Sequence, residues 1–370
     1  MKILINASNL NGGGGLQVAD SICRQLNRFP SVSFIVVLSP FLKKTASAIS
    51  HFDNVKVYEY LLPHSLKVLI TGRDLFLDQI TSSEKVDKVL TIFGPSFWVP
   101  KVPHLCGFAS GQLTPQDSPF YRTKLPLGFR IKDKIRNLIM KTYYGRCSEY
   151  LYSENESVSS ELRKIYPKKK VFTVTNYYNQ VFDHPEQWKE HRLPDFNGKT
   201  LLTVTDTNRH KNVEIAIDIA KILEGRHPDF NFRFVFTFSE DQYPSVEESI
   251  KKHFLFIGRV DVSECPSLYQ QCDLEFQPTL LECFTATYPE AMRMGKPIVT
   301  TDLAFARQLC GNAAAYYSAL DAEDAAKVIY DVSTNVKYAE KLIAFGEKEL
   351  EMYDNYEKRA TKLINIISEL

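Results

Sequence analysis

Short apolar runs alternate with amphipathic stretches along most of this 370-residue chain. Such runs are typical of buried strands, and apolar residues at every third or fourth position are typical of helices. Strands that alternate with helices favour a parallel sheet with crossover helices. In the first half of the chain, the pattern predicts strands at residues 2–7, 33–38, 55–60, 88–92, 105–108, 150–153 and 171–174.

The alternation stops at a polar, proline-containing passage, residues 184–195, and then restarts. We therefore place a domain boundary between Asn176 and Gly198 and predict an α/β chain with domains at residues 1–178 and 179–350. A long helical segment over residues 335–370, with residues 351–370 as a separate C-terminal helix, carries the apolar stripe Leu342, Phe345, Leu350 and Tyr353. The restarted pattern predicts strands at 200–205, 232–238, 254–257, 274–277 and 298–300, and helices at 212–223 and 267–271.

Composition narrows the class of protein. The chain is 44% hydrophobic and 24% charged, as soluble globular proteins are. Its formal net charge of +1 gives no global field that would select a nucleic acid. No run approaches the roughly 18 apolar residues of a membrane span, and the apolar start at residues 1–5 is too brief for a signal peptide. We expect a cytoplasmic protein.

Cysteines and acidic residues give no sign of a metal site. The seven cysteines are scattered and form neither a CxxC pair nor a metal-ligand spacing, so a reducing cytoplasm is the simplest location. No Asp-x-Asp triplet is present to hold a divalent cation on a diphosphate. We therefore expect no metal and no cofactor.

Two glutamates stand eight positions apart in the run Glu282-Cys-Phe-Thr-Ala-Thr-Tyr-Pro-Glu290, between the strand at 274–277 and a helix that begins near Thr287. At such a junction, backbone N–H groups lack helical partners and the helix dipole favours an anion. A diphosphate would fit at the loop Phe284, Thr285, Ala286 and Thr287. Glu282 and Glu290 could then accept hydrogen bonds from hydroxyls on either side, which suits a nucleotide-sugar. The alternative is an ordinary strand–helix junction.

Four successive glycines, Gly12, Gly13, Gly14 and Gly15, follow the first strand and open a helix. Glycine reaches positive φ and lets a ligand approach the backbone, whereas a plain turn needs only one or two such residues. We favour a ligand loop over a flexible turn. The run lacks the G-x-G-x-x-G pattern, so a nicotinamide-dependent oxidoreductase is the least favoured class.

The Glu282 to Glu290 spacing resembles the E-x7-E signature of retaining glycosyltransferases of the GT-B fold, particularly family 4 (glycosyl transferases group 1). The similarity continues through Gly295-Lys-Pro-Ile-Val and covers essentially the whole chain. Cys283, Thr285 and Thr287 depart from the family's Gly, Gly and Pro. The resemblance implies two Rossmann-like domains that face a central cleft, with the C-terminal helix returning toward the first domain. It also implies a nucleoside-diphosphate sugar bound mainly to the second domain.

The resemblance also implies roles for residues of the second domain. Glu290 would hold the ribose and Glu282 would orient the sugar. Lys211 matches the position that contacts the donor phosphates. Thr205-Asp206 stands in place of the family's Gly-Arg pair, and we infer that Arg209 replaces the missing cation. Asn208 is expected to cap the following helix. Arg259 and Val260, after Gly258, are base-contact candidates; an ordinary turn is the alternative.

Roles in the first domain follow from the same resemblance. Gly13, Gly14 and Gly15 would face the donor diphosphate across the cleft. Gly107 takes the place of the histidine that many relatives hold over the donor sugar. The acceptor would enter from the first domain near Gly12–Gly15 and Gly107–Ser110, and Ser110 or Gln112 would shape its side of the site. His104 falls inside the strand, where a lone histidine is more often part of the core, and it is assigned no role.

The segment between Phe120 and Arg146 is basic and amphipathic. Ile131, Ile135, Leu138, Ile139 and Thr142 fall on one helical face. Such a helix is typical of membrane-surface attachment; a core-packed helix with a solvated basic face and an anionic-acceptor site are the alternatives. The basic residues are Arg122, Lys124, Arg130, Lys132, Lys134, Arg136, Lys141 and Arg146, against only Asp133.

Together these patterns predict a metal-independent, hexosyltransferase-like enzyme. It would move a sugar from a UDP- or GDP-sugar to a glycan or lipid-linked acceptor with retention, in cell-surface polysaccharide or lipopolysaccharide synthesis. The acceptor would attack the face that the leaving group vacates, without a covalent intermediate. We expect it in the cytoplasm, peripheral at the inner face of the membrane. The alternatives are a GT-B epimerase or hydrolase, and a non-catalytic nucleotide-sugar-binding protein.

Overall fold

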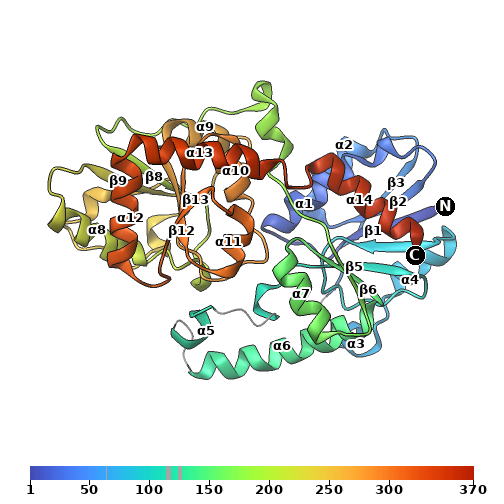
Figure 1. Ribbon diagram of the computed structural model, residues 1–370. Coiled ribbons are helices and arrows are strands. Elements are labelled where there is room, and N and C mark those ends of the chain that lie inside the picture. The colour runs from blue at the N-terminus through green and yellow to red at the C-terminus, as the bar shows by residue number, and fades with distance from the viewer. Residues whose placement is uncertain (64, 114–117, 124–126) are drawn as a thin grey trace. The chain divides into compact units, whose positions relative to one another are not determined.

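The chain forms two compact units in the computed structural model, which describes residues 1–63, 65–113, 118–123 and 127–370. The first unit contains the described residues up to 113, residues 127–177 and residues 354–370. The second unit contains residues 118–123 and 178–353. Each unit has its own parallel sheet with helices on its faces (Figure 1).

The first unit is built on a seven-stranded parallel sheet in the order β3-β2-β1-β4-β5-β6-β7. Its strands are β1 (Lys2–Ala7), β2 (Ser33–Leu38), β3 (Val55–Glu59), β4 (Lys88–Thr91), β5 (His104–Phe108), β6 (Tyr150–Ser153) and β7 (Lys170–Thr173). Its helices are α1 (Gly14–Cys23), α2 (Lys43–Ile49), α3 (Leu66–Thr71), α4 (Leu75–Ser83), α6 (Leu127–Cys147), α7 (Glu156–Ile165) and α14 (Tyr356–Glu369), with 3-10 turns η1 (Leu26–Arg28), η2 (Pro40–Leu42) and η3 (Gly111–Leu113).

The second unit is built on a six-stranded sheet in the order β10-β9-β8-β11-β12-β13, also parallel. Its strands are β8 (Lys199–Thr203), β9 (Phe232–Phe236), β10 (Phe254–Phe256), β11 (Leu274–Gln277), β12 (Ile298–Thr301) and β13 (Ala314–Tyr317). Its helices are α5 (Phe120–Thr123), α8 (Ile215–Arg226), α9 (Cys265–Gln271), α10 (Thr287–Arg293), α11 (Ala304–Cys310), α12 (Ala322–Thr334) and α13 (Val336–Leu350). Its 3-10 turns are η4 (Gln180–Asp183), η5 (Pro185–Gln187), η6 (Arg209–Lys211), η7 (Glu240–Gln242) and η8 (Lys251–His253).

The strand order fixes where a ligand is expected in each sheet. The order reverses between β1 and β4 in the first unit and between β8 and β11 in the second. Ligands of open parallel sheets bind beyond the carboxyl ends of the strands at this reversal. The glycines 12–15 follow β1. The loops that carry Lys211 and Glu282 follow β8 and β11.

The terminal segment, predicted as helical with a separate C-terminal helix over residues 351–370, forms the two helices α13 and α14. The chain breaks between α13 and α14, and Asn355 caps α14 by accepting a hydrogen bond from the Lys358 amide at 2.8 Å. At the break, Asp354 and Thr175 exchange two hydrogen bonds, of 2.6 and 3.1 Å. Helix α14 then packs on α1 and β4 and buries Leu363, Ile364 and Ile367 in the core of the first unit (Figure 1).

Residues 118–123 also differ from their predicted grouping in the first domain. The Ser118 hydroxyl donates to the Leu280 carbonyl at 2.5 Å, and Phe120 packs against Leu280 and Leu281. These contacts attach the segment to the second unit. Strand β13 was not predicted from its short sequence, Ala-Ala-Tyr-Tyr. None of the helices in the described part of the chain is long and apolar enough to cross a membrane.

Candidate functional site

Two loops of the second unit meet where its strand order reverses. One follows β8 and contains η6; the other follows β11 and leads to α10. The backbone N–H of Leu280 donates to the His210 carbonyl at 2.7 Å. The Thr279 hydroxyl oxygen lies 3.3 Å from the same carbonyl. These contacts hold the loops together, so side chains far apart in the sequence share one site.

Lys211 and Glu282 form an ion pair at this meeting point. The distance from Lys211 Nζ to Glu282 Oε1 is 2.6 Å, and the side chains are only 16% and 10% exposed. The Thr279 hydroxyl donates to the same carboxylate oxygen at 2.8 Å. An ammonium group has three N–H donors, so Lys211 can also bind an anion while it holds Glu282. The structure thus brings together two of the predicted site residues.

His210 lies beside this pair and was not among the predicted site residues. Burial lowers the pKa of its imidazole, although the nearby Glu282 carboxylate acts in the opposite direction. Its ring meets Phe120 edge-on, with 6.2 Å between ring centroids. Thr279 and Phe120 were also missed. The position of His210 between Arg209 and Lys211 could have marked it as a site residue. No feature of the sequence indicates that Thr279 and Phe120 contact this loop.

The loop after β8 differs from the predicted helix start. Helix α8 begins at Ile215, and Asn212 adopts a left-handed conformation with φ of 52°. Asn208 does not cap α8; its side chain donates to Asp206 at 2.6 Å, and its backbone N–H donates to the same carboxylate at 3.0 Å. Asp206, at the position of the family's arginine, thus closes a local turn. Arg209 is exposed on η6.

Glu290 lies in the first turn of α10, which begins at Thr287 with Ala286 as its N-cap. Burial raises the pKa of Glu290 to about 7, partly opposed by a hydrogen bond from Tyr269. Thr285 and Thr287, which replace the family's Gly and Pro, are buried, and their hydroxyls lie 3.1 Å apart. The junction between β11 and α10 therefore contains buried polar side chains.

The remaining residues predicted to bind the donor lie on separate loops of the second unit. Phe284 is half-buried and meets the Tyr353 ring edge-on at 6.0 Å. Gly258 has a φ of 73° directly after β10. Beyond it, Arg259 is exposed and Val260 half-buried. Their proposed contact with the base stays a prediction.

The glycine loop of the first unit is open. Gly13 has a φ of 66° and is the N-cap residue of α1. A Cβ atom at Gly12, Gly13 or Gly14 would meet no atom of the described residues within 4 Å, whereas one at Gly15 would contact Leu10 at 3.4 Å. Local packing therefore does not require glycine at the first three positions, but the positive φ of Gly13 favours glycine there. At Gly12 and Gly14, neither packing nor a positive φ accounts for the glycine.

The acceptor candidates of the first unit lie at the end of β5. A Cβ atom at Gly107 would stand 1.9 Å from the Ile92 carbonyl oxygen, so packing alone requires glycine there. Ser110 is half-buried, and its carbonyl accepts from the Leu113 amide at 3.1 Å. His104 is buried between the Thr91 hydroxyl, at 2.9 Å, and the Cys147 carbonyl, at 2.8 Å. Burial lowers its pKa to about 4, as expected of a core histidine.

Helix α6 exposes its apolar face. Ile131, Ile135 and Leu138 are 59%, 58% and 66% exposed. The opposite face is the buried one, through Tyr143, Tyr144 and Cys147. The core-packed alternative is therefore wrong for the isoleucine and leucine stripe. Lys124 and the side chain of Arg122 lie outside the described part of the chain.

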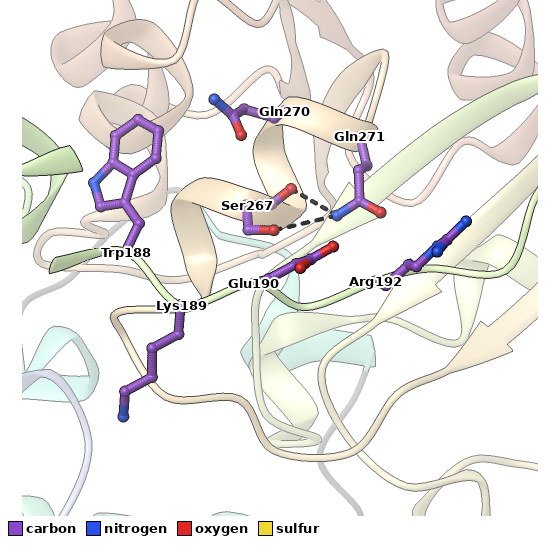
Figure 2. Close-up of a pocket in the computed structure, with 7 residues that line it drawn as sticks. All are labelled: Trp188, Lys189, Glu190, Arg192, Ser267, Gln270 and Gln271. Carbon is purple, nitrogen blue, oxygen red and sulfur yellow. Dashed lines mark hydrogen bonds between the residues drawn. The ribbon is translucent and has the colours of Figure 1, made fainter. Parts of the chain in front are cut away.

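A separate hollow of about 510 Å³ lies between residues 188–192 and α9. Figure 2 shows Gln271 hydrogen-bonded to Ser267 at its wall. The wall combines Lys189, Glu190 and Arg192, and the hollow contains none of the predicted site residues. The described residues contain no group of three or more His, Cys, Asp or Glu side chains that could hold a metal ion.

Comparison with known proteins gives one family match and several similar structures. Residues 185–349 match the model of the family described as Glycosyl transferases group 1. This segment lies within the second unit, which carries Lys211, Glu282 and Glu290. No curated protein sequence matches the chain significantly.

The similar structures extend over the whole chain. They include a glycosyltransferase from Rickettsia africae ESF-5, with 14% identity, a TM-score of 0.69 and coverage of 100% of this chain and 97% of that one. Sucrose-phosphate synthase from Thermosynechococcus elongatus has 13% identity, a TM-score of 0.72 and coverage of 100% and 98%. Anabaena HepE in complex with UDP and glucose has 11% identity, a TM-score of 0.66 and coverage of 100% and 99%. At this level of identity, the similarity establishes the fold.

Proposed function

From the GT-B fold of the chain, and the match of its residues 185–349 to glycosyl transferases group 1, we propose that the protein is a retaining glycosyltransferase. It would transfer a sugar from a UDP- or GDP-sugar to a glycan or lipid-linked acceptor. The observation that carries the proposal is the Lys211–Glu282 pair at the strand-order reversal of the second unit. A fixed cation and carboxylate suit a diphosphate and a sugar hydroxyl, respectively.

In this proposal, each residue acts on a different part of the donor. Lys211 stabilises the departing diphosphate; a cation about 4 Å from such a charge contributes roughly 4 kcal/mol at an effective dielectric near 20. Glu282 orients the sugar through its hydroxyls, and Glu290 accepts from the ribose. Arg209 adds a second cation from η6. Arg259 and Val260 contact the base, and the glycines 13–15 approach the diphosphate.

The transfer breaks the bond between the anomeric carbon and the diphosphate oxygen and forms a bond from that carbon to an acceptor oxygen on the same face. The acceptor proton passes to the departing phosphate, so the protein supplies no covalent nucleophile. We propose that the acceptor contacts the first unit near Ser110 and Gln112. The chemistry needs no metal if Lys211 and Arg209 neutralise the diphosphate. A role in cell-surface polysaccharide synthesis would follow from a lipid-linked acceptor.

Ligand-dependent thermal stability tests the donor class first. UDP, GDP, ADP and CDP, with their common sugar conjugates, would each be added to the protein with and without magnesium or a chelator. Ligand at 100 times its Kd adds about 2.7 kcal/mol to the free energy of unfolding. A shift with UDP or GDP that persists in chelator and is lost in Glu290→Ala supports the proposal. The absence of any shift would reject it.

A turnover assay then separates the enzymes from the alternatives. Incubation of the protein with the donor that it binds, with and without candidate acceptors, gives three distinct results. Nucleoside diphosphate release that requires an acceptor supports a transferase. Release without an acceptor indicates an epimerase or hydrolase. Donor binding without turnover over the whole acceptor panel indicates a non-catalytic binding protein.

We further propose that α6 attaches the first unit to an anionic membrane surface. Its exposed Ile131, Ile135, Leu138 and Ile139 recur at helical spacing and form one stripe. On a helix of 3.6 residues per turn, Lys134 and Lys141 flank one edge of this stripe, and Lys132 and Arg136 flank the other. Arg146 donates to the Ile70 carbonyl at 3.3 Å, and Ile70 of α3 is itself 71% exposed.

An apolar stripe between two rows of cations complements the boundary of an anionic bilayer. The isoleucines and leucine would enter the acyl region while the lysines meet headgroups, each cation contributing about 1 kcal/mol. A protein partner would need a matching apolar and acidic face, and a second copy of the chain would bring its own cations. Charge complementarity therefore favours lipid.

Sedimentation with vesicles tests the membrane contact. Binding is expected to vesicles of phosphatidylglycerol and phosphatidylcholine and to fall strongly for phosphatidylcholine alone. Ile135→Ser with Leu138→Ser should abolish it, whereas Val336→Ser, at an equally exposed position of the second unit, should not. Equal vesicle binding of the wild type and the Ile135→Ser, Leu138→Ser variant would reject this proposal. It would also be rejected if the wild type is a dimer, the variant is a monomer and vesicle binding does not change, because the stripe would then bind a second copy of the chain.

A further inference from the structure

Strand β11 carries a carboxyl group into the interior of the second unit. Side chains alternate across a sheet, and Leu274 and Phe276 enter the apolar core that also includes residues of α8 and α12. Glu275 and Gln277 therefore point to the opposite face, where β11 packs against α10. Both side chains are buried, Glu275 completely. An apolar residue would fill this position at a lower desolvation cost.

Glu275 belongs to a hydrogen-bonded network that reaches the proposed donor site. The Gln277 amide donates to Glu275 Oε1 at 3.1 Å and to the Thr287 hydroxyl at 2.9 Å. The Thr287 hydroxyl lies 3.1 Å from that of Thr285. Tyr269, on α9, donates to the Thr287 carbonyl at 3.4 Å. The network thus ties β11 and α9 to the junction at the start of α10.

The network also connects the two buried carboxyls. Burial, together with the adjacent Glu290, raises the pKa of Glu275 well above its usual range, although hydrogen bonds with Thr287, Tyr269 and Gln277 act in the opposite direction. Tyr269 also hydrogen-bonds Glu290, and this bond partly opposes the rise that burial causes in the pKa of Glu290. Two carboxyls in one buried site do not both ionise readily. Glu275 is therefore the one that stays neutral.

We propose that Glu275 is a positioning residue for donor binding. As a neutral carboxyl it fixes Tyr269, Gln277 and Thr287, and through them it holds the Thr285–Thr287 junction and Glu290 in one arrangement. Glu290 can then carry the only negative charge of the pair when it accepts hydrogen bonds from the donor. This inference rests on the proposed function, because Glu290 acts on the donor only if the protein binds a nucleotide-sugar.

The other ionisable groups that interact with Glu275 do not titrate near neutral pH. Burial is the main cause that raises the pKa of the Cys265, Cys272 and Cys310 thiols and of the Tyr269 phenol. Glu290 remains as the group of this set with a pKa of about 7. Within this set, a pH dependence of donor binding near neutrality therefore belongs to Glu290, whereas burial lowers the pKa of His210, beside Lys211.

Two substitutions separate positioning from simple packing. Glu275→Gln keeps the shape of the side chain, one hydrogen-bond donor group and one acceptor. Its affinity for the nucleotide-sugar is expected to lie within about threefold of the wild-type value, with an unchanged pH midpoint. Glu275→Met fills the space without hydrogen bonds. It is expected to weaken donor binding more than tenfold while the melting temperature stays the same or rises, because the desolvation cost of a buried carboxyl has been removed. A purely structural role would not separate affinity from stability in this way.

The test uses calorimetric titration of the full chain with the nucleoside diphosphate sugar that gives the thermal shift, between pH 5.5 and 8.5. The inference would be overturned if Glu275→Met binds the donor as tightly as the wild type does. It would also be overturned if the pH midpoint of donor binding shifts in Glu275→Gln. If Glu275→Met does not fold, Thr287→Val breaks the same network at its far end and should weaken binding similarly. Failure of the wild type to bind any nucleotide-sugar would instead reject the proposed function.

Discussion

At the scale of single residues, the candidate site contains charged side chains that are largely buried. Burial removes water from these charges, so their energies depend strongly on the protein groups beside them. Lys211 and Glu282 are little exposed, so each is the principal neutralising partner of the other at the distance of 2.6 Å. Removing one partner of such a pair leaves the other charge poorly solvated. Glu290 forms no ion pair with the described residues, and burial raises its pKa. The two glutamates of one sequence motif therefore have different electrostatic environments.

The Lys211–Glu282 pair should be required for transfer, whereas each single variant should still fold, with a lowered melting temperature because the other charge is left unpaired. Glu282→Ala and Lys211→Met are each expected to lower kcat by about 10²–10³, the effect of removing one group that stabilises developing charge. Lys221→Met, which breaks the exposed pair with Glu247, is the matched control and should leave kcat unchanged. Steady-state kinetics with melting temperatures measure both effects. Near-normal turnover of Glu282→Ala would contradict the role given to it.

Glu290 should make the stability of the second unit fall as the pH rises. Its pKa is about 7 in the folded state, against about 4.3 in an unfolded chain. The folded state therefore binds more protons between these values, and the free energy of unfolding decreases across this window by on the order of 3 kcal/mol. Denaturant unfolding of wild type and Glu290→Gln at pH 5 and pH 8 measures it. The same pH dependence in both proteins would contradict the assignment.

At the scale of elements, close packing determines which sequence features are structural. Gly107 and the glycines 12–15 both follow from the sequence as candidates for the site. The structure separates them, because β5 packs so tightly against the end of β4 that Gly107 has no room for a Cβ atom, whereas Gly12 faces open space. A glycine required by packing gives no independent evidence for a ligand.

Gly107→Ala should destabilise the first unit strongly. The added Cβ would stand 1.9 Å from the Ile92 carbonyl oxygen, so the strands must shift, at a cost of about 3 kcal/mol. Gly12→Ala introduces the same atom into open space and is expected to change the free energy of unfolding by less than about 0.5 kcal/mol. Chemical denaturation compares the two variants. Equal stability would show that β5 adapts without cost.

At the scale of the whole molecule, the chain builds each unit from separated segments. Residues 118–123 belong to the second unit, and α14 returns to the first. Leu363, Ile364 and Ile367 of α14 share a core cluster with residues of β1, β2 and α1. The first unit is therefore incomplete until residues 354–370 have been synthesised, whereas the second unit is complete at residue 353.

Truncation after Tyr353 should unfold the first unit selectively. It removes three buried aliphatic side chains of α14, and each loss of such a side chain costs about 2–5 kcal/mol. The second unit keeps all its described elements and should remain folded. Limited proteolysis followed by mass spectrometry identifies the protected fragment. Protection of residues 1–113 to the same degree as residues 178–353 would contradict this expectation.

The sequence by itself determined the strands of the first sheet and every strand of the second sheet except β13. Strands of a parallel sheet are buried on both faces and therefore appear as continuous apolar runs. From such runs, β1, β2, β6 and β11 were predicted to the residue. The start of α10 at Thr287 was also predicted, and the GT-B fold is confirmed. These features depend on residues that are close together in the sequence, so the pattern of apolar and polar positions is enough to predict them.

Only the tertiary structure decided the contacts between distant residues. Lys211 and Glu282 are 71 positions apart, and Ser118 and Leu280 are 162 apart; no local pattern specifies such pairs. Periodicity marks the apolar stripe of α6 but is the same for a helix that packs into a core and one that exposes the stripe. In the same way, the sequence shows Glu275 within a strand. Only the packing of α9 and α10 against that strand buries it beside Glu290 and raises the pKa of both carboxyls.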